Sequence, residues 1–267
     1  PTTQSDCEII IHLYRKFGIE KTLKMIDGEF AFILLDQSVE FCQEEDKIFF
    51  ARDIFGTRPL FIAEDPLSKL ILFASEIKSI NEFNLSASQI KPGTYGYLTK
   101  SLKVLSKWEF NFKQQNYFNI PFYNSTFNNI NDTTINSYCK VIYNNLYNSI
   151  YHRVIGTSER PIGCLLSGGL DSSLVAAFTA QIYKQPLHTF SIGMPGSLDL
   201  KNAKIVAKHI NSFHHEIILS PDEFFNAIDE VIYKIESYDT TTVRASVGNY
   251  LISKYIAQNN KAKVILN

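Results

Sequence analysis

Apolar positions along the chain follow two different periods, and the change between them lies near residue 110. The first apolar set recurs at helical spacing and consists of Ile9, Ile10, Leu13, Tyr14 and Phe17. We expect Asp6 to cap this helix and Gly18 to end it. Short apolar runs separated by Asp, Gly and Pro turns follow at 30–35, 48–51, 60–63, 70–74, 90–98 and 104–110. Residues 1–110 are therefore predicted to form a β-rich layered domain of α+β type with one flanking helix.

A second region begins after a stretch rich in Asn, Phe and Tyr. Residues 111–131 show little periodicity, and their aromatic content favours a linker that packs loosely on its neighbours over a free tether. Helices are then predicted over 132–153, 171–183, 199–211, 222–236 and 244–259, and strands over 162–166, 187–192, 216–219 and 264–266. Such alternation is typical of a doubly wound parallel sheet, which we predict for residues 132–267. The fold class is thus α/β overall.

Composition and charge exclude a disordered chain, a nucleic-acid-binding protein and a membrane protein. The 267 residues are 45% hydrophobic and 13% aromatic, enough for a packed core. With 26 basic and 27 acidic residues the net charge is −1, which gives no field for binding nucleic acid or an anionic membrane. No apolar run approaches the roughly 18 residues of a membrane span.

Cysteine and histidine positions give no metal pattern. The four cysteines lie outside metal-ligand spacing and have no histidine pair beside them, so we expect reduced thiols and a cytoplasmic protein. His214 and His215 are adjacent, and on a strand neighbouring side chains point to opposite faces.

The clearest chemical signal is a Gly-Ser loop between a predicted strand and a predicted helix. Gly168 and Gly169 allow a tight turn that brings backbone N–H groups close to an anion, and the hydroxyls of Ser167, Ser172 and Ser173 add donors. The positive end of the helix dipole lies where that anion would bind. The loop therefore predicts a phosphate site at the carboxyl edge of the parallel sheet.

Asp171 and the absence of a lysine restrict which phosphate ligand the loop can bind. The loop has no Gly-Lys-Ser/Thr sequence, so it is not the ordinary nucleotide loop. The Asp171 carboxylate would repel a polyphosphate unless a cation bridges the two, which predicts Mg²⁺. The alternative is a serine-rich turn in which Asp171 only caps the helix.

Residues 167–173 resemble the pyrophosphate loop of the ATP pyrophosphatases, which split ATP into AMP and pyrophosphate. Within that group the chain is similar over its whole length to the glutamine-dependent asparagine synthetases. The segments that carry the resemblance are 5–8, 27–32, 52–61, 74–76, 163–173, 189–194 and 236–246. The resemblance implies a glutamine amidotransferase domain over 1–110, a linker over 111–131 and an ATP pyrophosphatase domain over 132–267.

In the second domain the resemblance assigns roles around ATP and Mg²⁺. Leu165 and Ile192 match positions that frame the adenosine, although both also read as core residues. Asp171 and the backbone of the loop would hold pyrophosphate with Mg²⁺. Thr241 and Arg244 match positions that face aspartate and its adenylate.

Two of these positions have simpler explanations as well. Arg244 is predicted to open a helix, a poor dipole position for a cation, so an anionic ligand or an ion pair with Glu236 or Asp239 would explain it. Asp6 matches a residue that pairs with the α-amino group of glutamine, beside its predicted role as a helix cap.

The run 52–61 is interpreted structurally. Gly56 and Pro59 shape a turn between two strands, and we expect carboxylates to hold Arg52 and Arg58. No catalytic role is assigned there.

The implied reaction converts aspartate, glutamine and ATP into asparagine, glutamate, AMP and pyrophosphate through a β-aspartyl adenylate. The sequence starts at Pro1, without the amino-terminal cysteine of the amidotransferases, and stops at Asn267, before a later acidic loop and lysine. We therefore expect an internal piece of a larger enzyme, or a truncated copy, that alone hydrolyses no glutamine and makes little or no asparagine. The alternatives are a related enzyme that adenylates another acid, as in β-lactam-forming relatives, and an inactive nucleotide-binding remnant. The expected partners are the small-molecule substrates, with a second copy of the chain as an open alternative.

Overall fold

The chain divides into two compact units, Pro1–Thr126 and Phe127–Asn267, and each is described by itself. The computed structural model describes Thr3 and residues 5–37, 46–65, 67–68, 70–100, 108–109, 115–119 and 132–267. The domain limits at 110 and 132 stay predictions, and most of the predicted linker lies outside the described residues.

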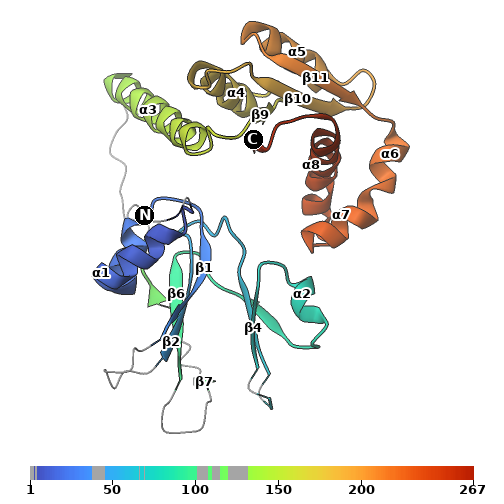
Figure 1. Cartoon of the computed structure of the whole chain (residues 1–267). Helices are drawn as coiled ribbons and strands as arrows, with labels where there is room; N and C mark the ends of the chain where they lie inside the picture. Colours follow the sequence, from blue (N-terminus) through green and yellow to red (C-terminus); the bar gives the residue numbers. More distant parts are fainter. Residues whose placement is uncertain are drawn as a thin grey trace. The chain divides into compact units, whose positions relative to one another are not determined.

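The first unit consists of one long helix and two antiparallel sheets (Figure 1). The helix is α1 (Glu8–Met25), and a short α2 (Lys78–Asn81) follows later in the chain. One sheet contains β1 (Ala31–Asp36), β2 (Asp46–Arg52), β6 (Thr94–Lys100), β7 (Trp108–Glu109) and β8 (Gln115–Asn116). The other has the order β4 (Ile71–Ala74), β3 (Phe61–Glu64), β5 (Ala87–Gln89). The predicted layered α+β architecture is confirmed.

Alternation along β2 separates two apolar layers. Phe50 packs with Leu60 and Ile62 between the sheets, while the next residue, Ala51, packs with Leu23 of α1 on the opposite face. Gly96 lies across from Phe50 on β6, and a Cβ there would stand 2.4 Å from Cζ of the Phe50 ring. The glycine therefore makes room for the largest side chain of this core.

The first helix was predicted to end at Gly18, and this prediction is wrong. Gly18 has φ 74° and ψ 173°, which is not helical, yet the chain resumes the helix and reaches Met25. Gly18 kinks α1 instead of ending it, because Ile19 and Leu23 beyond the kink pack on the sheet.

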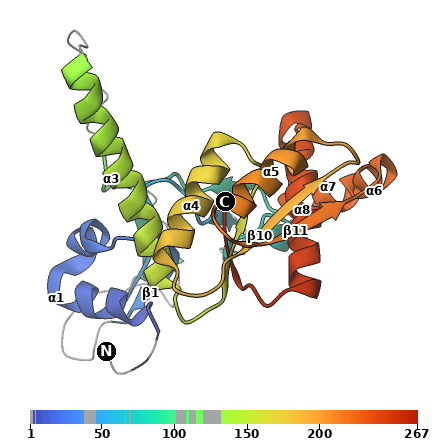
Figure 2. The same cartoon turned by 90° about the horizontal axis from the view of Figure 1, so that it is seen from above.

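The second unit is built around a four-stranded parallel sheet of order β11-β10-β9-β12. Its strands are β9 (Ile162–Leu165), β10 (His188–Gly193), β11 (Phe213–Ile218) and β12 (Val264–Leu266). Its helices are α3 (Asp132–Gly156), α4 (Leu170–Ile182), α5 (Leu198–His209), α6 (Pro221–Asn226), α7 (Ile228–Ile235) and α8 (Thr240–Asn259). Figures 1 and 2 show α4 and α5 on one side of the sheet and α8 on the other.

Two apolar clusters flank this sheet. Cys164 and Leu166 face α3, α4 and α5, where they pack with Phe178 and Ala203. Phe190 faces α8 on the other side, with Ile252 and Ile256 of that helix among its neighbours. Both faces are thus covered by helices, and the predicted doubly wound parallel sheet is confirmed.

Two helix predictions differ from the structure. The single helix expected over 222–236 is two helices that meet at Ala227, whose N–H donates to the carbonyl three residues back at 3.4 Å. The last helix begins at Thr240 and not at Arg244, because Asp239 caps it by accepting the N–H of Thr242 at 2.8 Å. Across the described ranges every helix is too short or too polar to cross a membrane.

Candidate nucleotide site

The loop from Ser167 to Gly169 joins β9 to α4 at the carboxyl edge of the sheet. Ser172 closes it: its hydroxyl oxygen accepts the N–H of Ser167 at 3.3 Å and lies 2.9 Å from the Ser167 hydroxyl. The N–H of Gly169 donates to the Ser167 hydroxyl at 3.3 Å. Ser167, Gly169 and Asp171 are exposed, so an anion can approach the backbone of the loop from solvent.

Gly168 presses the loop against α5. Its φ is +79°, a conformation that side-chain-bearing residues rarely adopt. A Cβ at this position would stand 2.5 Å from the backbone nitrogen of Ala203 and 2.5 Å from Cβ of Asn202. Both the backbone conformation and the contact with α5 therefore require glycine here.

The first turn of α4 supplies the positive side of the site. Its N-cap is Gly169, which makes no side-chain cap, so the alternative role of Asp171 as the helix cap is wrong. The first N–H groups of a helix have no acceptor within the helix, and those of Leu170 and Asp171 are at this position. They are available to the oxygens of an anion at the loop.

Asp171 fits the predicted metal as a single ligand. It is exposed in the first turn of α4, and the described part of the chain contains no cluster of three or more metal-ligating side chains. Mg²⁺ is commonly held by one or two carboxylates together with substrate phosphates and water. A lone carboxylate beside a phosphate loop is therefore compatible with Mg²⁺ that arrives with a nucleotide.

Leu165 and Ile192 lie on the same face of adjacent strands. Leu165 pairs with Phe190 across the ladder, and Ile192 follows Phe190 by two residues, so all three side chains share the face that α8 covers. Leu165 and Ile192 are partly exposed and lie toward the carboxyl end of their strands. They belong to the core cluster and also border the edge that carries the loop.

Thr241 and Arg244 lie in the first two turns of α8. They share a helix face with Gly248, because the three residues are spaced by three and four. A Cβ at Gly248 would lie 3.9 Å from Cγ2 of Ile192, which fixes this face of α8 against the sheet. Arg244 is one turn further toward the start of the helix, and both Thr241 and Arg244 are exposed.

The predicted reasons for an arginine at 244 need correction. Arg244 is the fifth residue of α8, so the dipole penalty expected for a cation at a helix start is largely absent. Asp239 Oδ2 is used by the N–H and hydroxyl of Thr242, at 2.8 Å each. No described residue forms an ion pair with Arg244.

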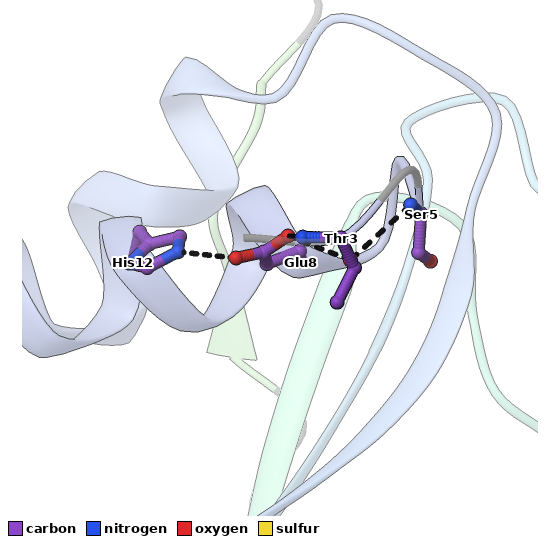
Figure 3. Close-up of polar contacts among 4 residues, drawn as sticks. All are labelled: Thr3, Ser5, Glu8 and His12. Atoms are coloured by element: carbon purple, nitrogen blue, oxygen red, sulfur yellow. Dashed lines mark hydrogen bonds and ion pairs between the residues drawn. The ribbon is translucent and has the colours of Figure 1, made fainter. Parts of the chain in front are cut away.

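The first unit places Asp6 differently from the prediction. Asp6 does not cap α1: the N-cap position is Cys7, without a side-chain cap. Glu8, the first helical residue, instead accepts the N–H and hydroxyl of Thr3 at 2.7 and 2.6 Å and contacts His12 at 2.9 Å (Figure 3). Asp6 is exposed beside this group, and its role toward glutamine stays a prediction.

Arg52 is held by carbonyl groups and not by carboxylates as predicted. Its guanidinium donates to the carbonyls of Arg58, Ile90 and Gly56 at 2.7, 2.7 and 2.6 Å. The carboxylate of Asp53 instead accepts the N–H groups of the same turn, including that of Arg58 at 3.1 Å. The interpretation of this segment as structural is supported, since Arg52 is buried and its guanidinium donates to three main-chain carbonyls.

The contact between the loop and α5 was missed by sequence reasoning. Asn202 and Ala203 meet Gly168 through their own backbone and Cβ atoms, more than 30 residues along the chain. A fully buried alanine in a helix has many explanations, so no sequence signal identified it.

Comparisons with known proteins match both units. The family model described as asparagine synthase matches residues 142–267, and the glutamine amidotransferase domain model matches residues 1–82. Curated asparagine synthetases [glutamine-hydrolyzing] of mouse and human are each 40% identical, over 281 and 287 residues. The matches cover 99% of this chain but 48% of each relative, so the chain spans about half the length of the curated relatives it matches. Among solved structures, the NH3-dependent NAD synthetase of Campylobacter jejuni covers 47% of this chain at 19% identity and a TM-score of 0.34, too weak to support an argument.

Proposed function

We propose that the chain takes part in glutamine-dependent formation of asparagine, because the glutamine amidotransferase domain model matches residues 1–82 and the asparagine synthase model matches residues 142–267. In this proposal the second unit binds ATP and activates the side-chain carboxylate of aspartate. The first unit belongs to the part that releases ammonia from glutamine.

The observation that carries the proposal is the exposed loop Ser167–Gly169 and the side chains around it. An exposed Gly-Ser turn at a helix start suits pyrophosphate, with the Ser173 hydroxyl as a further donor of the first helical turn. Leu165 and Ile192 offer an apolar border for the adenosine. Thr241 and Arg244 would add a hydroxyl and a cation from α8, which suit the carboxylates of aspartate.

The proposed chemistry has two displacements. An oxygen of the aspartate β-carboxylate attacks the α-phosphorus of ATP, and the bond to the bridging oxygen breaks as pyrophosphate leaves. Ammonia then attacks the acyl carbon of the adenylate, the carbon–oxygen bond breaks, AMP leaves and one proton is released to water. The N–H groups of the loop stabilise the negative charge that gathers on the departing pyrophosphate. Mg²⁺, held by Asp171 together with the phosphates, would supply further neutralisation of that charge. Free amino acids and ATP as substrates favour a cytoplasmic location.

Nucleotide binding by this chain tests the proposal. We expect ATP to bind more tightly with Mg²⁺ than with EDTA, and Asp171→Asn to remove most of that difference. Asp229→Asn is the matched control, because Asp229 is likewise an exposed second residue of a helix, α7, whose apolar cluster with α8 contains no residue of the loop. Equal Mg²⁺ dependence in the wild type and Asp171→Asn would contradict the role of Asp171, and no ATP binding at all would contradict the site.

The acid that is activated needs a separate measurement. ATP–pyrophosphate exchange by the full-length protein with a panel of carboxylic acids is expected to favour aspartate and to weaken with Arg244→Met. Preference for another acid would support a related adenylating enzyme, and exchange with none, despite ATP binding, would support the inactive remnant.

A further inference from the structure

Three polar side chains meet on the face of the sheet that α8 covers, near the edge opposite the candidate nucleotide site. His188 is the first residue of β10, His215 is in β11, and Asn260 directly follows α8 as its C-cap. The His188 Nδ1 lies 2.9 Å from His215 Nε2 and 3.4 Å from Asn260 Nδ2. The three residues come from three separate segments, so their contacts join these segments.

Both rings are held flat against aromatic neighbours. His215 stacks on Phe190 with ring centroids 4.8 Å apart and an interplanar angle of 15°. His188 stacks on Phe213 at 5.4 Å and 26°. Neither imidazole can therefore turn away from the other without breaking a stacked pair.

The contact of Asn260 fixes which nitrogen carries the proton. The Asn260 Oδ1 accepts the N–H of Ala262 at 2.9 Å, which leaves its Nδ2, a donor only, facing His188. His188 Nδ1 must therefore be the acceptor, and the proton between the rings belongs to His215 Nε2. In this arrangement both imidazoles are neutral, each with its proton on Nε2.

We propose that His188, His215 and Asn260 form an acid-sensitive clasp, which fastens the end of α8 to β10 and β11 while the two rings share at most one added proton. One extra proton can be placed on His215 Nδ1 and leaves the bond between the rings intact. A second must go to His188 Nδ1, where its N–H would face two N–H donors at 2.9 and 3.4 Å. The clasp therefore opens before the second proton can enter.

Few charged groups surround the clasp to offset a cation. On the sheet, β9 presents Gly163 and β12 presents Ile265 to this face, and α8 presents Tyr255. Lys261 and Lys263 on the connection to β12 are exposed cations.

Glu216, the acid nearest in sequence, points to the opposite face of β11 and pairs with Lys204 at 3.6 Å. Among the described residues no carboxylate forms an ion pair with either ring. Burial, and after it the proximity of His188, lowers the pKa of His215.

The effect on stability has a definite sign. Because the folded pKa of His215 is below the unfolded value near 6.5, the unfolded chain binds more protons in mild acid. The stability that the neutral His215 contributes is fully present above about pH 6.5, and it is lost as the pH falls from there through the lower folded pKa. Each excluded proton reduces the folding equilibrium constant by up to about tenfold per pH unit in that window.

Unfolding of the second unit between pH 5 and 8 tests the clasp in the full chain. Hydrogen exchange in urea, followed on peptides of β10, β11 and the end of α8, isolates this unit. We expect the wild type to lose stability below about pH 6.5 and His215→Gln, which keeps a donor near Nε2 without titrating, to lose less. The loss that remains in this variant is that of His214, whose pKa burial also lowers. His152→Gln on an exposed surface of α3 is the matched control and should keep the acid loss of the wild type. An acid loss as large in His215→Gln as in the wild type would overturn the proposal.

Imidazole nitrogen shifts measured by NMR on the wild type give a second readout that needs no variant. At neutral pH both rings are expected to carry their proton on Nε2. On acidification, at most one ring should become imidazolium while the native spectrum persists. Two imidazolium rings in a chain that is still native would overturn the proposal equally.

Discussion

Gly168→Ala is the sharpest test of how the nucleotide loop is held. The substitution imposes two separate costs: Gly168 has φ +79°, and the new Cβ would stand 2.5 Å from the backbone nitrogen of Ala203. A left-handed conformation costs a residue with a side chain about 1–2 kcal/mol, and overpacking costs about 1–3 kcal/mol. We therefore expect the second unit to lose about 2–5 kcal/mol, a large part of a typical stability of about 5–15 kcal/mol.

Gly196→Ala separates the two costs. Gly196 also has a positive φ, +83°, but a Cβ there would meet nothing within 4 Å. This control should lose only about 1–2 kcal/mol, the conformational part. Urea unfolding followed by hydrogen exchange in peptides of β9 and α4 measures both variants, and a thermal shift with Mg²⁺ and ATP measures the site.

The difference between the two variants is the decisive quantity. If Gly168→Ala loses no more free energy of unfolding than Gly196→Ala, then α5 moves aside at no cost. The loop would then not be packed tightly against α5 as described. Retention of full ATP binding by a folded Gly168→Ala chain would separately refute the need for this turn in the proposed site.

Two further predictions concern buried groups. Arg52→Met should destabilise the first unit by at least about 3 kcal/mol, since three carbonyls lose their donor and each costs about 1–3 kcal/mol when left unpaired. Arg58→Met is the control and should change the stability little, because the Arg58 side chain is 65% exposed. Equal effects of the two variants on hydrogen exchange of β2 would contradict this. Burial raises the pKa of the Cys164 thiol to about 11, so at pH 8 iodoacetamide should label the exposed Cys7 and Cys139 well before Cys164. Peptide mass spectrometry measures the labelling of each cysteine. Rapid labelling of Cys164 in the native chain would contradict its place in the described core.

The sequence was most informative where one short segment determines the structure. The turn at Gly168 and Gly169 lies between an apolar strand and an apolar helix, so its position at the carboxyl edge followed from local order alone. The opposite directions of His214 and His215 also followed from strand geometry: His214 contacts Thr189 at 2.9 Å, whereas His215 contacts His188 on the other face.

Features that depend on register or on competing partners could not be predicted. The pairing of His188 with His215 requires the alignment of β10 and β11, which no pattern of residues states. Arg52 lies near acidic residues in sequence, yet the fold brings three carbonyls to its guanidinium instead. Asp6 was a good cap by residue type, but the helix begins two residues later, at Glu8.

The length of α8 sets how far apart its two functional ends lie. Its 20 residues extend about 30 Å. Thr241 lies in the first turn, where the resemblance places a contact with aspartate, and Asn260 follows the last residue, where it joins the two histidines. A substitution at either end can therefore be measured without altering any side chain that touches the other.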